Sequence, residues 1–371
     1  MKYLTIILLL IMFFSCKMKS KESEKKNGNE VIDVINFNNS LVANLSDLCD
    51  SMTLIPFKTK SPIGNIEKLI FHDENIYIWD KNRERIWGFK NNGDSLFCID
   101  KQGKGAGEYI RIGDVSISDF GHINIVDTGS KRILCYNSKG ELQSSQKFNR
   151  WIHQYCSIDG YQYLFCATPP TPKGNYVDVM EGSKIINSYF PSTHNWHFDG
   201  TEFLRSGDSL FFTRRYDDCI YSFKNGVLNE AYNINFGNDA FYTRKLREAS
   251  TLQEHKNILK SRSYIGDIGN LSVTDTHITF DYSEPLDYMI VRTHFFFNRE
   301  TKIGLSFKSY GDSNKKYFSM GTPIGSDGHY FYALIEPWKL DEQSKMKLQE
   351  LTNYPLGTNL NCLLCRFLIK I

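Results

Sequence analysis

The residues that could do chemistry gather first around a glycine-rich stretch, Gly103-Lys104-Gly105-Ala106-Gly107-Glu108-Tyr109. Glycines at alternate positions can cradle a phosphate where a strand, a tight turn and the start of a helix follow one another. Here apolar strands are predicted on both sides, and no helix follows. The pattern therefore predicts a structural turn between two repeats, with positive φ values at its glycines and with Glu108 bracing it.

A second group of side chains is a candidate ligand rim. His194 and His197 are the only histidines at a short spacing, but the Pro and Gly residues around them indicate a loop, so no metal site is predicted. Arg214 stands where the first two repeats carry an Asp, and Arg215 lies beside it. Two neighbouring cations suit an anionic ligand or simply a solvated surface.

Three oxygen-bearing side chains are candidates for a central channel. Glu67, Asp114 and Asn270 lie in or beside strands that we expect to be innermost. Carboxylate and amide oxygens that converge from separate strands are ligands for calcium. Calcium is expected only if the chain is an enzyme, and otherwise no cofactor is predicted.

Composition and motifs argue against several functions. The formal net charge is +2, from 44 basic and 42 acidic residues, so the chain lacks the positive excess typical of nucleic-acid-binding proteins. The sequence contains no G-x-S-x-G or H-E-x-x-H motif. Cys362-x-x-Cys365 is the only CxxC, and because it has no second pair, a zinc site is not predicted.

The elements that must position these residues are short apolar strands arranged in repeats. Each of the first two repeats places an Asp, Asp80 or Asp127, after a strand and follows it with an Ile-led strand and a Gly turn. The equivalent residues Ile86, Ile133 and Ile220 recur at intervals of one and about two repeats. Aromatic residues make up 14% of the chain. Repeats of about 45 residues with four short strands each are typical of an all-β propeller.

The repeats predict six blades in one closed ring. The last repeat, which ends in residues 363–371, has three strands, and residues 53–57 form a spare strand near the other end of the chain. Pairing the two would close the ring and leave no open sheet edge. Residues 241–260 have a loosely amphipathic pattern, which predicts a short helical insertion between blades.

The N-terminal segment predicts export and a lipid anchor. Residues 1–15 combine Lys2 with an apolar run that is too short for a stable membrane span, and Cys16 follows directly. This arrangement resembles a bacterial lipoprotein signal, which implies cleavage before Cys16 and its acylation. An ordinary secretory signal with an incidental Cys is the alternative. Residues 16–33 are polar and charged, so we predict a flexible tether there and a propeller over residues 34–371.

Together these motifs resemble the six-bladed β-propeller lipoproteins of Bacteroidota. The matching residues are Leu54-Ile55-Pro56-Phe57-Lys58-Thr59, Ile63-Gly64, Asp80, Phe89-Lys90-Asn91-Asn92-Gly93, the glycine-rich stretch, Asp114 and Ile117. The resemblance implies a propeller at the cell envelope, on the periplasmic or surface face of the outer membrane. It implies no established catalytic residues.

Two functions are open on this basis. The first is a binding module, a monomer held to the membrane by its lipid, which presents one face to a glycan, a peptide or a partner protein and binds no nucleic acid. The second is a propeller enzyme that resembles gluconolactonases or polysaccharide lyases and has its site in the central channel. The binding module is the preferred hypothesis, because the channel residues only suggest a calcium site.

Overall fold

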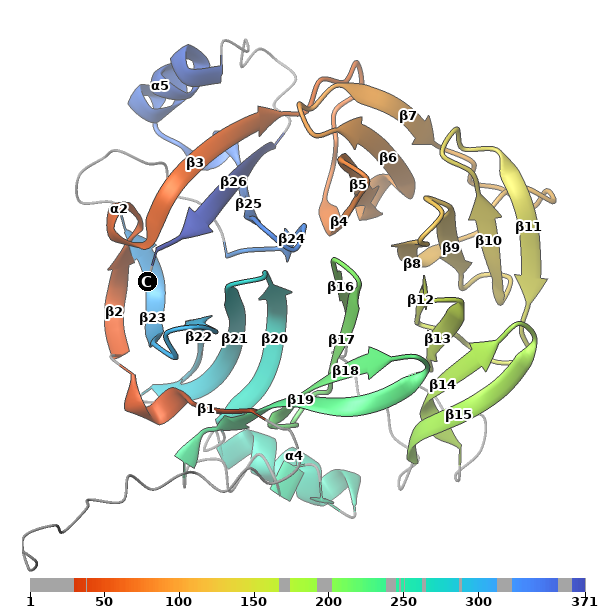
Figure 1. Cartoon of the computed structure of the whole chain (residues 1–371). Coiled ribbons are helices and arrows are strands. Elements are labelled where there is room, and N and C mark those ends of the chain that lie inside the picture. The colour runs from red at the N-terminus through yellow and green to blue at the C-terminus, as the bar shows by residue number, and fades with distance from the viewer. Residues whose placement is uncertain are drawn as a thin grey trace, which may run out of the picture.

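The protein is a ring of six mainly antiparallel sheets around a central axis, as its computed structural model shows (Figure 1). This arrangement confirms the predicted six-bladed β-propeller. The structure describes residues 30–37, 39–166, 174–191, 202–237, 245–246, 248–249, 251–261, 265–286, 289–311, 322–352 and 362–370.

Each blade has four strands that run up and down from the axis to the rim. Blades 1 to 3 consist, from the axis outward, of β4 (Ile66–His72), β5 (Asn75–Asp80), β6 (Arg85–Lys90) and β7 (Ser95–Ile99); β8 (Ile112–Ile117), β9 (Ile123–Asp127), β10 (Arg132–Tyr136) and β11 (Leu142–Lys147); and β12 (Gln154–Ile158), β13 (Tyr161–Phe165), β14 (Asn175–Glu181) and β15 (Lys184–Pro191). Blades 4 to 6 consist of β16 (Glu202–Ser206), β17 (Ser209–Thr213), β18 (Cys219–Lys224) and β19 (Val227–Asn235); β20 (Gly266–Val273), β21 (His277–Leu286), β22 (Met289–Asn298) and β23 (Gly304–Gly311); and β24 (Gly325–Ser326), β25 (Phe331–Ile335), β26 (Leu363–Ile369) and β3 (Cys49–Pro56).

The core lies between the blades. Six clusters of buried apolar side chains fill the six interfaces between neighbouring sheets. The middle strands are therefore buried on both faces, and in β5 every residue from Ile76 to Asp80 is buried. The outer strand β11 is mostly exposed. Burial of both faces explains why the middle strands read as continuous apolar runs, which made them visible in the sequence.

The ring closes through its N-terminal strand. β3 pairs antiparallel with β26, so that Pro56 lies opposite Leu363 and Cys49 lies opposite Ile369. This pairing confirms the predicted closure, with a strand that begins four residues earlier than expected. Gly93 lets blade 1 approach the end of β3, because its φ is +83° and a Cβ there would lie 2.0 Å from the Pro56 carbonyl oxygen.

Two further N-terminal strands were not predicted. β1 (Glu30–Asp33) pairs parallel with β19, and β2 (Asn39–Asn44) pairs parallel with β23, so blades 4 and 5 each gain a fifth strand. The predicted boundary of the tether after residue 33 is therefore wrong, because the last four residues of that segment belong to a sheet. Ile32 is fully buried between blades 4 and 5, and this burial outweighs the polar character of its neighbours.

Helices lie only in connections within the described ranges. The predicted insertion contains α4 (Leu252–Ser261), which connects blade 4 to blade 5 (Figure 1). The charged segment of blade 6 contains a helix that was not predicted, α5 (Glu342–Thr352), whose Leu348 is fully buried. None of the described helices has the length and apolar character needed to cross a bilayer. The remaining short elements are η1 (Val34–Asn36), α2 (Leu45–Leu48), η2 (Lys81–Arg83) and η4 (Pro337–Lys339).

Candidate functional site

The central channel opens into two separate cavities, one at each end of the ring. One has a volume of about 780 Å³ and the other about 610 Å³. Between them lies a space of only about 40 Å³, which is room for one or two water molecules. The propeller therefore offers two distinct mouths rather than one continuous pore.

Polar contacts between inner strands of different blades close the middle of the channel. Asp114 on β8 accepts a bond of 2.7 Å from the Lys68 ammonium of blade 1 and one of 3.0 Å from the Tyr155 amide of blade 3. Arg205 on β16 reaches from blade 4 to blade 2, where it donates to the Ile117 carbonyl at 3.1 Å and pairs with Asp119 at 2.8 Å. These bonds join four blades at the axis and separate the two mouths.

The larger cavity, which we call the aromatic mouth, receives residues from all six blades. The connections between blades and those between the second and third strands of each blade meet at this end. Its charged side chains are Glu67, Lys68, Lys81, Glu84, Arg111 and Asp114, and its aromatic side chains are Trp79, Trp151, His153, Phe165 and Phe203. Trp79 is buried, whereas Trp151 is 44% exposed. The surface of Trp151 is therefore available to a ligand.

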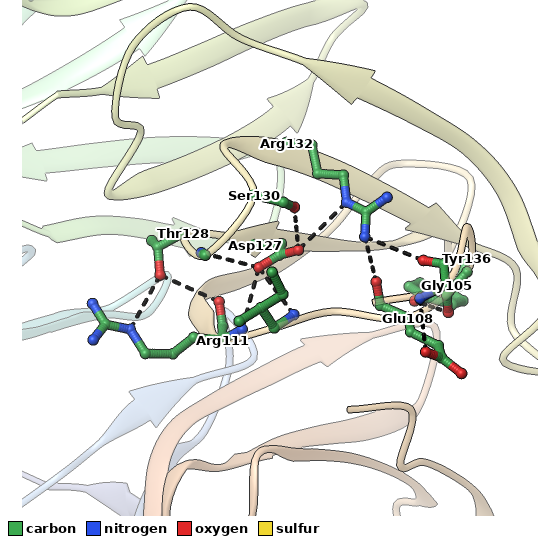
Figure 2. Close-up of polar contacts among 11 residues, drawn as sticks. Gly105, Glu108, Arg111, Asp127, Thr128, Ser130, Arg132 and Tyr136 are labelled. Atoms are coloured by element: carbon green, nitrogen blue, oxygen red, sulfur yellow. Dashed lines mark hydrogen bonds and ion pairs between the residues drawn. The ribbon is translucent and has the colours of Figure 1, made fainter. Parts of the chain in front are cut away.

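Arg111 is held at this mouth by its backbone and by its side chain (Figure 2). Asp127, fully buried at the end of β9, accepts bonds of 3.2 Å from the amides of Ile110 and Arg111 and one of 3.1 Å from Gly129. The Arg111 Nε donates to the Thr128 hydroxyl at 3.3 Å. The terminal nitrogens of the guanidinium have no recorded partner among the described residues. The result is an exposed, oriented cation.

The glycine-rich turn supports this loop from the other side. Arg132 bonds to Asp127 at 3.4 Å and donates to the Glu108 carbonyl at 2.6 Å, so that the turn and the Asp127 loop are connected, as Figure 2 shows. The Tyr109 ring is fully buried, and its hydroxyl donates to the Glu84 carbonyl at 2.6 Å. Burial raises the pKa of Tyr109, so its hydroxyl stays protonated and acts as a donor.

The turn lies between blades 1 and 2, as predicted, but the expected reason for its glycines is wrong. Gly103, Gly105 and Gly107 do not have positive φ values. Instead, the chain wraps closely around the Glu108 carboxylate, which accepts a 2.8 Å bond from the Gly105 amide. A Cβ at Gly103 would lie 2.0 Å from that carboxylate. The missing side chain makes room for Glu108, which does brace the turn.

Blade 1 uses the same device as blade 2. The buried Asp80 at the end of β5 accepts bonds of 2.8 Å from Gly64 and 3.1 Å from Asn65, the residues that precede β4. In both blades this Asp mainly holds the segment that enters the first strand, and blade 2 carries Arg111 where blade 1 carries Asn65.

The smaller cavity, which we call the acidic mouth, is lined by the hairpins between first and second strands. These hairpins carry an aspartate in every blade, and the six residues are Asp73, Asp119, Asp159, Asp208, Asp275 and Asp327. All but Asp275 line the cavity. Sequence reasoning missed this ring, although the signal was present as Asp beside Gly at three of the six turns, a pattern that favours hairpins.

The three predicted channel residues line the aromatic mouth together. Each has a partner of its own. Glu67 pairs with Lys81 at 2.5 Å, Asp114 with Lys68 at 2.7 Å, and Asn270 donates to Asp281 at 2.7 Å. Within the described ranges no group of three or more His, Cys, Asp or Glu side chains is placed to hold a metal ion.

The sequence also matches a family model over most of its length. The model, described as a domain of unknown function (DUF4934), matches residues 29–359. The chain belongs to the DUF4934 family. This match begins within one residue of β1 and includes every strand except β26, so the β-propeller is the fold of the family domain in this chain.

Solved structures from Bacteroides resemble this DUF4934 chain. A candidate exported protein of Bacteroides fragilis NCTC 9343 is 18% identical with a TM-score of 0.71, over 92% of this chain and 100% of that chain. A member of the DUF4221 family from Bacteroides vulgatus is 12% identical with a TM-score of 0.49, over 87% and 97% of the two chains. No curated protein matches. At such identities the first of these similarities shows the fold alone.

Of the candidate rim of this DUF4934 chain, the two residues that the structure describes, Arg214 and Arg215, line neither mouth. Arg214 lies 3.5 Å from Asp217 and 4.3 Å from the centre of the Phe190 ring. Arg215 lies 3.5 Å from Asp267. Both arginines therefore already have acidic partners. His194 and His197 lie outside the described residues.

Burial keeps the thiols of the described cysteines from acting as ready nucleophiles. The eight thiols of the described residues are free. Burial raises the pKa of Cys156, which borders the middle of the channel, to about 12, and it does the same for Cys362. A thiol with such a pKa is protonated at neutral pH and is a poor nucleophile.

Proposed function

We propose that this chain is a binding module of the cell envelope, and that the aromatic mouth receives its ligand, a glycan, a peptide or a segment of a partner protein. One observation carries the proposal. A cavity of about 780 Å³, open to solvent and closed at its inner end, combines an exposed Trp151 with the guanidinium of Arg111, which has no ion pair within the described part of the chain. Its volume lies in the range of small-ligand sites, about 300–1,000 Å³.

The way the mouth is built supports a binding role. Trp151, Arg111 and Thr128 lie on connections, whereas the strands beneath them are buried and tied together at the axis. Binding residues are commonly presented on loops by such a rigid scaffold. A ligand in this mouth would contact several blades at once.

A lipid on Cys16 would hold the module at the membrane. The proposal rests on the apolar run that ends directly before Cys16 and on the polar segment after it. The similarity to a candidate exported protein of Bacteroides fragilis supports an extracytoplasmic location. One acyl-modified Cys at the start of a polar segment would leave the propeller free to face its ligand.

Replacement of Cys16 by Ala tests the location. The variant is expected to leave the membrane fraction or to remain as an uncleaved precursor, because no acylated residue remains. The measurement is cell fractionation with mass determination of the mature protein. If Cys16→Ala still fractionates with the membrane as the mature protein, the lipid anchor is wrong, and the binding site is unaffected by that result.

Replacement of Trp151 by Ala tests the binding site. The purified protein is screened against arrayed glycans, peptides and envelope extracts, and each hit is titrated with wild type and variant. Loss of the ring is expected to weaken binding at least about tenfold, a typical effect for a central aromatic anchor. Trp338→Ala is the matched control, since Trp338 is 45% exposed and does not line the mouth. Equal weakening by both variants would contradict the proposal.

A further inference from the structure

We propose that the ligand of the aromatic mouth is an oligosaccharide with an acidic sugar, whose carboxylate is bound by Arg111 and whose ring packs against Trp151. This inference rests on the proposed function and specifies the class of its ligand. Three features carry it: the Arg111 guanidinium is held in place by its neighbours, Trp151 is exposed in the same cavity, and the amides of Ile112, Phe203 and Tyr155 are already hydrogen-bonded to side chains.

Arg111 is already arranged for a carboxylate. Its backbone amide is bonded to Asp127 and its Nε to the Thr128 hydroxyl, and the residue is exposed to solvent. The two terminal nitrogens remain, and a planar guanidinium binds a carboxylate through two parallel hydrogen bonds. Because the side chain is held in place before binding, little conformational freedom is lost when the anion arrives.

The other lysines of the mouth are already paired with carboxylates, which sets Arg111 apart from them. Lys68 is neutralised by Asp114 and Lys81 by Glu67, whereas Arg111 and Lys131 have no recorded ion pair in the described part of the chain. Glu84 is the only lining carboxylate without a recorded cation, and its oxygen accepts a 2.7 Å bond from the Ile112 amide. Among the described residues that line the mouth, Arg111 and Glu84 are the charged side chains without an ion pair, because Lys131 lies outside the lining. Since Glu84 already accepts the Ile112 amide, Arg111 is the lining cation left to attract an acidic ligand.

Trp151 is placed to receive the ring of that ligand. The Lys131 ammonium lies 4.6 Å from the centre of the Trp151 ring, and Lys131 belongs to the same loop as Thr128, the partner of Arg111. The cation on the ring restricts how the ring can move, while 44% of the residue stays exposed. A flat apolar face with a nearby fixed cation suits a sugar ring that carries a carboxylate.

The backbone amides of the innermost strands at this mouth are already hydrogen-bonded, which favours a sugar over an extended peptide as the ligand. An extended peptide would need free backbone groups to pair with a strand edge. The Ile112 amide is bound to Glu84 at 2.7 Å, and the Phe203 amide is bound to Gln154 at 3.1 Å. The Tyr155 amide is likewise bound to Asp114 at 3.0 Å. Side chains of neighbouring blades thus occupy the donors that a peptide strand would use.

The test compares ligands that differ only in charge. An array carries uronic-acid oligosaccharides, the same oligosaccharides as methyl esters, neutral oligosaccharides and acidic peptides. Wild type, Arg111→Gln and Trp151→Ala are probed on it, and the best ligand is titrated by calorimetry. Arg83→Gln is the matched control, because Arg83 donates to the Pro62 carbonyl at 2.7 Å at an exposed position and does not line the mouth.

Wild type is expected to bind uronic-acid oligosaccharides and not to bind the same oligosaccharides when their carboxylates are methyl esters. Arg111→Gln should weaken this binding about 10- to 100-fold, as expected for loss of a charge-assisted pair, and Arg83→Gln should leave it unchanged. Binding to esters or neutral sugars that still depends on Trp151 would overturn the acidic ligand but retain the proposed site. Preference for acidic peptides would overturn the sugar. If neither Arg111→Gln nor Trp151→Ala changes the binding, both this inference and the proposed site are overturned. If wild type binds nothing on the array, only this inference is overturned.

Discussion

The two mouths of the channel are built by the same six blades, but they differ in what their connections carry. The acidic mouth is lined by short hairpins that repeat an aspartate from blade to blade. The aromatic mouth is lined by the other connections, in which each blade differs from the next. Repetition indicates a requirement of the turn itself, whereas Arg111 and Trp151 have no equivalent in blade 1. We therefore locate ligand recognition at the mouth where the repeat is broken.

Aspartate illustrates the difference between the two mouths. Asp127 near the aromatic mouth is fully buried and holds three backbone amides. In the hairpins at the other end of the ring, the side chain of Asp73, which lines the acidic mouth, is 81% exposed, and that of Asp275, which lies outside the cavity, is 80% exposed. A buried carboxylate without its donors would be very costly, and an exposed one interacts mainly with water. Asp127 is thus structural and Asp73 mainly a surface charge, whereas Asp119 and Asp327 combine the two roles, because they pair with Arg205 and with the Tyr332 hydroxyl.

The largest expected effect removes both mouths at once, because both depend on the closed ring. A variant that begins after Phe57 lacks β1, β2 and β3 and exposes the edge of β26. We expect it not to fold into a stable monomer, since the loss exceeds the about 5–15 kcal/mol that stabilises a typical domain. Circular dichroism and size-exclusion chromatography measure the outcome.

A shorter deletion separates the effect of the closing strand from that of the first added strand. A variant that begins at residue 39 keeps β2 and β3 but loses β1, η1 and Phe37, and with them the buried Ile32 and Val34. It should fold with a loss of about 3–6 kcal/mol, or about 1.5–3 for each buried side chain. A variant that begins at Glu30 is the reference. If the variant without β3 were as stable as the reference, the closure would not support the ring.

The second effect concerns one mouth. Asp127→Ala should lower the free energy of unfolding by about 3–5 kcal/mol, because it leaves buried amides and Arg132 without their acceptor. Asp208→Ala at the acidic mouth is the matched control, since Asp208 is exposed and its change should stay within about 0.5 kcal/mol. Urea unfolding of both variants gives the comparison. Similar losses would mean that the two mouths use aspartate in the same way.

Much of the fold could be predicted because its signals are local. The middle strands are buried on both faces and read as apolar runs, and turns such as Asn92-Gly93 separate them. β1 and β2 could not be found in this way. They are short, they belong to no repeat, and their partners β19 and β23 lie far along the chain. Parallel pairing at such separation leaves no periodic pattern in the sequence.

The candidate site was less predictable, because its residues meet only in the folded ring. Arg111 is a candidate because Thr128, from a different loop, holds its side chain, and because Trp151, from the connection to the next blade, lines the same cavity. The broken repeat directed attention to Arg214 and Arg215 instead, and those residues pair with Asp217 and Asp267. Sequence shows where a repeat is broken. It does not show whether a neutralising partner lies nearby in space.

A third, smaller effect concerns the polar contacts that separate the two mouths at the middle of the channel. Arg205→Ala removes the pair with Asp119 and the bond to the Ile117 carbonyl, so we expect a loss of about 1–3 kcal/mol. It should also open a path to Cys156, which borders the small central space. In a Cys98→Ser background, which removes an exposed thiol, a small thiol reagent should modify Cys156 faster. An unchanged rate would show that Arg205 does not separate the mouths.

The smallest effect is a pH dependence that belongs to the acidic mouth. Burial lowers the pKa of His72 from its ordinary value of 6.5, and Arg205 acts in the same direction, while Asp73 and Asp119 oppose the shift. Below about pH 6.5 the unfolded chain therefore binds a proton that the folded protein resists. Protonation of His72 thus does not affect the free energy of unfolding above this pH, and it lowers that free energy as the pH falls below about 6.5.

Replacement of His72 by Gln, which is neutral at every pH, should remove this contribution. The melting temperatures of wild type and variant are measured from pH 7.5 down to pH 5. Because all other titrating groups are shared, the difference between the two curves isolates His72. The variant should lose less stability than wild type as the pH falls. Parallel curves would show that burial at the acidic mouth does not affect protonation of His72, and a steeper decline in the variant would mean that the carboxylates Asp73 and Asp119 dominate there.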